Sequence, residues 1–142
     1  MEVSQVRKRL LTAVGRARKA AQERRQRAAD TERAYDQFLS EVATPVARML
    51  VTALKAEGHA FTVNTPGGAV RLVPDRGRDD FIEIALDTTA DPPEVSGRIS
   101  YQRGSRTITS ERPLKPGSPP RSITDEDVLS FLLEGLTPWL ER

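Results

Sequence analysis

Apolar residues in the first third of the chain recur in alternating steps of four and three. The line runs through Leu10, Val14, Ala17, Ala21, Arg24, Ala28, Thr31, Tyr35, Phe38 and Val42. This spacing predicts one long helix over Val6–Val42 with the seam that a coiled coil buries against a partner helix. The side chains at the two ends of the seam are bulky, those in its middle are small, and Arg24 interrupts the line. We predict a homodimer with an interface formed by Leu10, Val14, Ala17, Ala21, Ala28, Tyr35 and Phe38.

The sequence leaves the orientation of the two helices open. With Leu10 at heptad position d, Arg27 and Glu32 fall at g and e, where they can pair between the chains of a parallel dimer. Such a pair contributes little to stability. Nothing else in the pattern distinguishes parallel from antiparallel pairing.

Thr44-Pro45 interrupts the helical pattern. Thr is a favourable N-cap and Pro fits the first turn of a helix, so the chain either kinks or restarts its helix here. A core-facing stripe then predicts a helix from Pro45 to Glu57, with Gly58 as its C-terminal cap. The stripe consists of Val46, Met49, Leu50 and Leu54.

Five short segments of alternating apolar and polar residues follow. Four of them are 59–65, 70–72, 82–86 and 95–101, and the last runs near Arg106–Glu111. Pro66-Gly67 and Arg103-Gly104 have the composition of tight turns. Short alternating segments at hairpin spacing predict an antiparallel meander with one apolar and one polar face.

A proline-rich loop at residues 113–121 leads to the last helix. Thr124 is its predicted N-cap, and the three acidic residues that follow suit the positive end of a helix dipole. We therefore predict an α+β fold: a long N-terminal helix kinked near Pro45, a five-stranded antiparallel meander sheet and a C-terminal helix, with the helices on one face. We divide it into a basic N-terminal helical arm (residues 1–44) and an α+β domain (residues 45–142).

The charge distribution adds an alternative function for the arm. Residues 1–29 hold nine Lys or Arg against Glu2 and Glu23, a net charge of +7; the whole chain carries +2, so residues 30–142 carry −5. Cations attract phosphates, which makes nucleic-acid binding the alternative to self-association. We favour self-association because the charges surround the helix and no aromatic residue precedes Tyr35. The candidate phosphate contacts are Arg7, Lys8, Arg9, Arg16, Arg18, Lys19, Arg24, Arg25 and Arg27.

The polar face of the predicted sheet is a second candidate surface. It is either a docking surface for a protein partner or an ordinary hydrated face with cross-strand pairs, and we favour the latter. We identify no stacking aromatic residue on it, which argues against an RNA-binding sheet. The face carries Thr62, Asn64, Arg71, Glu83, Asp87, Arg98, Ser100, Gln102, Thr107 and Thr109.

Residue types with catalytic chemistry are scarce. The chain has no cysteine, and His59 is its only histidine, so thiol chemistry and histidine-rich metal sites lack material. The acidic residues between Asp75 and Asp87 do not have the spacing of an EF-hand loop, and we interpret them as solvated turn and strand residues. Trp139 is interpreted as a clasp that holds the C-terminus to the core. We predict no metal site and no cofactor.

No run approaches the roughly 20 apolar residues that span a bilayer, and the segment from Leu10 to Gly15 is too short for a signal-peptide core. The basic half of the arm presents mostly alanine on its apolar line, which buries too little to anchor it on a membrane. We expect a soluble, cytoplasmic, non-enzymatic interaction protein. An enzyme or small-ligand binder with a pocket between sheet and helices is the least favoured alternative.

Overall fold

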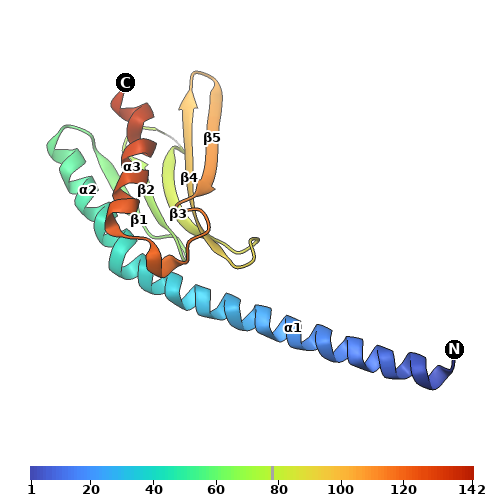
Figure 1. Cartoon of the computed structure of the whole chain (residues 1–142). Helices are drawn as coiled ribbons and strands as arrows, with labels where there is room; N and C mark the ends of the chain where they lie inside the picture. The colour runs from blue at the N-terminus through green and yellow to red at the C-terminus, as the bar shows by residue number, and fades with distance from the viewer. Residues whose placement is uncertain (78) are drawn as a thin grey trace.

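The computed structural model describes residues 1–77 and 79–142 and has an α+β arrangement (Figure 1). The predicted fold class is confirmed: a long N-terminal helical segment, a five-stranded antiparallel sheet and a C-terminal helix. The elements are α1 (Val3–Phe38), the π-helix η1 (Leu39–Ala43), α2 (Thr44–Ala56), β1 (Phe61–Asn64), β2 (Val70–Pro74), β3 (Phe81–Asp87), β4 (Glu94–Arg103), β5 (Arg106–Pro113), the 3₁₀ helix η2 (Pro120–Ser122) and α3 (Asp125–Leu140).

The first three elements form one continuous helical rod that bends at η1 (Figure 1). Pro45 has no N–H to donate, and the bend lies directly before it. At the bend the Thr44 N–H donates to the carbonyl of Leu39, five residues earlier, which is the hydrogen bond of a π turn. Thr44 itself has helical dihedrals (φ −65°, ψ −46°). The predicted kink is therefore confirmed, and Thr44 does not restart the helix as an N-cap.

The sheet is an antiparallel meander in the order β1-β2-β3-β4-β5. Cross-strand partners share a face, so the register Leu72↔Ile82↔Ile99 carries one apolar row across three strands. α2 lies against β1 and β2, and α3 lies against β3 and β4, on the same side of the sheet (Figure 1). β1 and β5 are the two edge strands of the sheet.

A glycine in β4 allows α3 to lie close to the sheet. A Cβ at Gly97 would lie 2.2 Å from Cζ of Phe131, so any side chain there would displace the ring. Phe131 fills this space and is fully buried. The side chains of the core around it are buried, and truncating buried apolar side chains is costly. The most buried members of the core are Val70, Leu72, Ile82, Ile84, Val95, Val128, Leu132 and Leu136.

The C-terminal end of α3 is held by a buried polar contact. Trp139 packs edge-on against Phe61 and Tyr101, with ring centroids 5.9 and 5.7 Å apart. Its indole Nε1–H donates to Oδ2 of Asp80 over 3.1 Å, and Oδ1 of the same carboxylate accepts from the backbone N–H of Gln102 over 3.0 Å. Trp139 thus has the clasp position expected from the sequence. Asp80 is buried, which corrects its interpretation as a solvated turn residue.

Candidate functional site

The helical arm is attached to the body through three buried side chains near the C-terminal end of α1. Ala34, Tyr35 and Phe38 lie inside the body, and the Tyr35 hydroxyl donates to the carbonyl of Gly68 in the β1–β2 loop. Burial raises the pKa of Tyr35 well above its ordinary value. Tyr35 and Phe38 were predicted to form a dimer interface, but they belong to the core of their own chain. The seam open to a second copy therefore ends near Thr31.

Beyond this attachment, α1 projects away from the body (Figure 1). At 1.5 Å per residue its free part, Val3 to Arg33, is about 45 Å long. On the predicted seam Leu10 is 59% exposed and Ala17 is exposed. Val14, Ala21 and Ala28 are half-buried. The predicted seam is thus an uncovered surface of the single chain.

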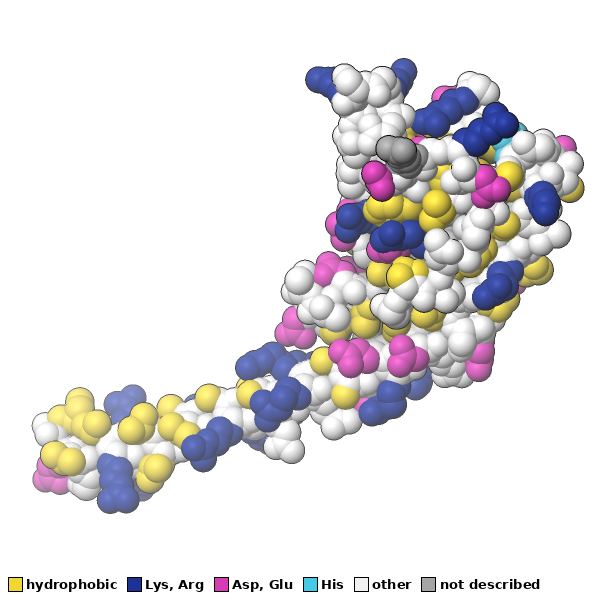
Figure 2. All heavy atoms as spheres, turned by 180° about the vertical axis from the view of Figure 1, so that it is seen from behind, with side chains coloured by type: hydrophobic (Ala, Val, Ile, Leu, Met, Phe, Trp, Pro, Cys, Tyr) yellow, Lys and Arg dark blue, Asp and Glu magenta, His cyan; other side chains and the backbone are white. Residues whose placement is uncertain are grey.

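Apolar side chains gather towards the free end of the arm, where Figure 2 shows them in yellow. Val3, Val6 and Leu11 are exposed, as is Leu10. A globular chain rarely leaves several large apolar side chains together in water unless they meet a partner. This end of α1 is the most apolar exposed part of the arm.

The nine predicted phosphate contacts, Arg7 to Arg27, are all exposed and lie around the arm (Figure 2). Among the residues that the structure describes, the arm has one ion pair, between Asp30 and Arg33. Gln26 also donates to Asp30, over 3.1 Å. The cations N-terminal to Asp30 thus have no carboxylate within ion-pair distance in the described chain, and their mutual repulsion disfavours an isolated helix.

The outer face of the sheet carries the ten predicted polar residues, because the strand register places them in shared rows. One row runs Asn64↔Arg71↔Glu83↔Arg98 across β1 to β4. Nε of Arg71 donates to Oε2 of Glu83 over 2.8 Å. Further along, Nε2 of Gln102 donates to Oγ1 of Thr107 over 2.7 Å. Such cross-strand pairs are the usual content of a hydrated sheet face, and a protein partner on it stays a prediction.

Phe81 also lies on this outer face, which corrects the expectation that the face has no aromatic residue. Its register partner is Ser100, another outer residue. The guanidinium carbons of Arg71 and Arg98 lie 4.2 and 5.3 Å from the ring centroid. The ring is therefore stacked by the chain's own arginines, a cation–π arrangement that covers it. The alternation with Ile82 and Ile84 was the sequence signal that could have placed it.

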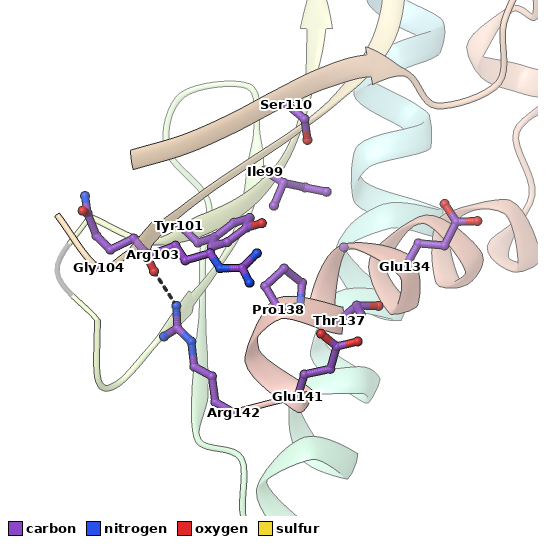
Figure 3. Close-up of a pocket in the computed structure, with 12 residues that line it drawn as sticks. Ile99, Tyr101, Arg103, Gly104, Ser110, Glu134, Thr137, Pro138, Glu141 and Arg142 are labelled. Atoms are coloured by element: carbon purple, nitrogen blue, oxygen red, sulfur yellow. Dashed lines mark hydrogen bonds between the residues drawn. The ribbon is translucent and has the colours of Figure 1, made fainter. Parts of the chain in front are cut away.

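A groove of about 710 Å³ lies between α3 and the β4–β5 hairpin (Figure 3). Tyr101 and Arg103 reach into it from the sheet, and Thr137 and Pro138 line the helix side. Arg142 closes one end by donating to the carbonyl of Gln102 over 2.7 Å. The least favoured alternative placed a ligand pocket between sheet and helices. This groove lies between the sheet and α3, at the margin of the apolar core, and an enzyme or ligand-binding role stays a prediction.

A smaller groove of about 300 Å³ lies between α2 and the first turns of α3. Its floor and walls are apolar, and Met49 stands 64% exposed on its side. Asp125 and Glu126, both exposed, form its acidic rim. The apolar members of the lining are Val46, Met49, Leu50, Ala53 and Leu129.

Two carboxylates have pKa values below their ordinary value, and both belong to local backbone motifs. The pKa of Asp127 is lowered chiefly by the backbone N–H of Thr124, its partner in the capping box that begins α3. That of Asp87 is lowered chiefly by the side-chain hydroxyl of Thr89. Hydrogen bonds that favour the charged form explain both shifts without an acid–base site.

Within residues 1–77 and 79–142, no group of three or more His, Cys, Asp or Glu has the arrangement of a metal site. Over the same residues, no helix has the length and apolar character needed to cross a bilayer. The candidate binding surfaces are therefore the exposed arm, the outer face of the sheet and the two grooves of the body. The sequence matches no protein-family model, and the searches of curated proteins and of solved structures found no similar protein.

Proposed function

We propose that this protein is a non-enzymatic interaction module that forms homo-oligomers through α1. The observation that carries this proposal is the free part of the helix, about 45 Å long, which leaves Leu10, Leu11 and Val6 in water. Isolated helices are marginal in water, and most helical stability in proteins comes from packing an apolar face. A second copy offers an apolar helix of the same kind.

The small residues on the seam limit how strong this association is. Ala17, Ala21 and Ala28 bury little area each, although they let a second element approach closely. Leu10 and Val14 supply most of the apolar area of the free seam. We therefore expect association that depends on protein concentration and on these two side chains.

Sedimentation velocity over a concentration series tests the proposal. Wild type is expected to sediment increasingly as an oligomer, and Leu10→Asp/Val14→Asp to sediment as a monomer. Phe38 is left unchanged because it is a core residue of the body. The matched control is Thr12→Asp/Gln22→Asp, which adds the same charges at exposed positions off the seam. A wild type that stays monomeric at the highest concentration would reject the proposal.

Nucleic-acid binding by the arm is the second candidate. It is supported by the nine exposed cations, none of which lies within ion-pair distance of a carboxylate among the residues that the structure describes. Each phosphate contact releases counterions, so affinity for duplex DNA or RNA is expected to fall steeply as salt rises. Changing Arg16, Arg18 and Lys19 to Gln is expected to reduce that slope. The absence of any complex at low salt would remove this candidate.

A further inference from the structure

The chain carries both an exposed apolar helix end and a groove lined mostly by apolar residues. We propose that the N-terminal end of α1 in one copy docks into the groove between α2 and α3 of a second copy. The inference rests on the proposed function and makes it specific, because it names the surface that α1 binds. It differs from a coiled coil, in which the arm of one copy binds the arm of another.

The donor is the apolar stripe of the first turns of α1. Val3, Val6 and Leu10 are spaced i, i+3 and i+7, the anchor spacing by which an amphipathic helix lies in a groove. They are 85%, 49% and 59% exposed. Arg7 and Arg9, both exposed, flank the stripe on the helix surface. The docking face is thus apolar in its centre and positive along its sides.

The acceptor has the complementary arrangement. Its lining is apolar and includes the exposed Met49, while Asp125 and Glu126 stand on the rim. Asp127, the third acidic residue of this turn, already accepts hydrogen bonds from the backbone N–H of Thr124 and from Nζ of Lys115. An apolar centre with a negative rim matches the arm in both respects, and complementary charge fixes orientation and speeds association.

Charge also favours the groove over a second arm as the partner of α1. Pairing two arms brings a net +7 beside a net +7, whereas residues 30–142 carry −5. Coulomb repulsion between the arms is partly screened by salt, but it opposes pairing at every ionic strength. Docking on the body replaces this repulsion by attraction to Asp125 and Glu126.

The arm does not reach the groove of its own chain. α1 leads through η1 directly into α2, which is one wall of the groove, and its free end points away from the body (Figure 1). A straight helix of about 45 Å separates Val3 from the attachment. The groove must therefore receive the arm of another copy, and a reciprocal exchange of two arms closes a dimer with two identical contacts.

Complementation between two variants tests this inference. The arm variant is Val6→Asp/Leu10→Asp, and the groove variant is Met49→Lys/Glu126→Lys. All four positions are exposed, so both proteins are expected to fold, which circular dichroism and thermal unfolding check. Alone, each variant is expected to self-associate at least ~10-fold more weakly than wild type, a loss of about 1.4 kcal/mol.

The decisive measurement is sedimentation of an equimolar mixture with one variant fluorescently labelled. The mixture retains one intact contact, between the arm of the groove variant and the groove of the arm variant, so it is expected to form a 1:1 heterodimer. A control groove variant, Thr52→Lys/Ser130→Lys, adds the same type of charge on exposed residues outside the lining and is expected to associate like wild type.

The outcomes separate this inference from the proposed function. If the groove variant associates as well as wild type while the arm variant does not, the arms bind one another, and only the docking inference is overturned. If neither variant changes the association, α1 is not the interface and both proposals fail. A heterodimer in the mixture, with neither variant dimeric alone, supports both.

Discussion

The free arm and the body use the same kind of apolar periodicity with opposite results. Leu10 in α1 and Leu54 in α2 lie on one continuous helical rod, yet Leu10 is 59% exposed and Leu54 is 6% exposed. Leu54 lies in the core of the body, whereas Leu10 is uncovered among the residues that the structure describes. Periodicity thus identifies the apolar side of a helix, but it does not tell whether the partner of that side belongs to the same chain.

Truncating one leucine in each region tests this difference between the body and the arm. Leu72→Ala removes a fully buried side chain from the centre of the sheet and is expected to lower the free energy of unfolding by about 3 kcal/mol. Leu10→Ala is expected to change it by less than about 0.5 kcal/mol in dilute, monomeric protein, because an exposed side chain loses little packing. Urea unfolding followed by Trp139 fluorescence measures both.

The same two variants can be compared at high protein concentration, at temperatures where both are folded. Under these conditions Leu10→Ala is expected to weaken association, whereas Leu72→Ala is not. A destabilisation by Leu10→Ala that persists at the lowest concentration would mean that the arm packs within its own chain. The contrast between arm and body would then be wrong.

The second prediction concerns the polar contact inside the body. Asp80→Ala leaves the indole N–H of Trp139 and the backbone N–H of Gln102 without their acceptor, and a buried unsatisfied donor is costly. We expect a loss of about 2 kcal/mol in unfolding free energy. Asp75→Ala is the matched control: Asp75 is exposed and accepts from Thr62, and its loss is expected to cost less than about 0.5 kcal/mol. Equal effects of the two variants would contradict the role of Asp80 as the buried acceptor that holds Trp139.

The smallest predicted effect lies at the junction of arm and body. Tyr35→Phe removes the hydroxyl that donates to the Gly68 carbonyl and is expected to cost about 1 kcal/mol near pH 7. Because burial raises the pKa of Tyr35, the folded chain keeps this proton after the unfolded chain has lost it. The stability that Tyr35 contributes is therefore complete below pH 10 and declines as pH rises above it.

Tyr35→Phe lacks this titration, so its deficit relative to wild type is expected to shrink above about pH 10, with a limiting slope of about 1.4 kcal/mol per pH unit. Taking the difference between the two proteins cancels the pH-dependent contributions that they share. Urea unfolding at pH 7 and at about pH 11 measures it. A deficit that stays constant over this range would show that Tyr35 ionises as readily in the fold as in the unfolded chain.

Most of the body was predictable because its residues have short-range signals. The alternation around Ile82 and Ile84 gave the correct inner face of β3, and the same period-two pattern predicted the meander. Thr124 followed by three acidic residues correctly marked the start of α3. Each of these signals acts within a few residues, so tertiary context did not need to be known.

The errors arose where distant residues decide the environment. Asp80 lies in an acidic run that resembles a solvated turn, and Gln102 and Trp139, both far along the chain, make it a buried acceptor. Tyr35 and Phe38 continue the heptad line, yet the β1–β2 loop and the body cover them. A repeat of apolar residues has the same form whether its partner is a second helix or the chain's own core.

The π turn at Leu39–Ala43 has a consequence for the direction in which the arm faces. A π turn takes up one more residue than an α turn, so α1 is rotated by about 100° about its axis relative to an unbroken α-helix of the same sequence. A change that restored the α pattern at these five residues would turn all of α1 about a quarter of the way round its axis. Leu10 and Val14 would then face another direction, and Tyr35 and Phe38, which also precede the π turn, would lose their places in the body. This short segment therefore sets the direction in which the apolar side of α1 faces relative to the body.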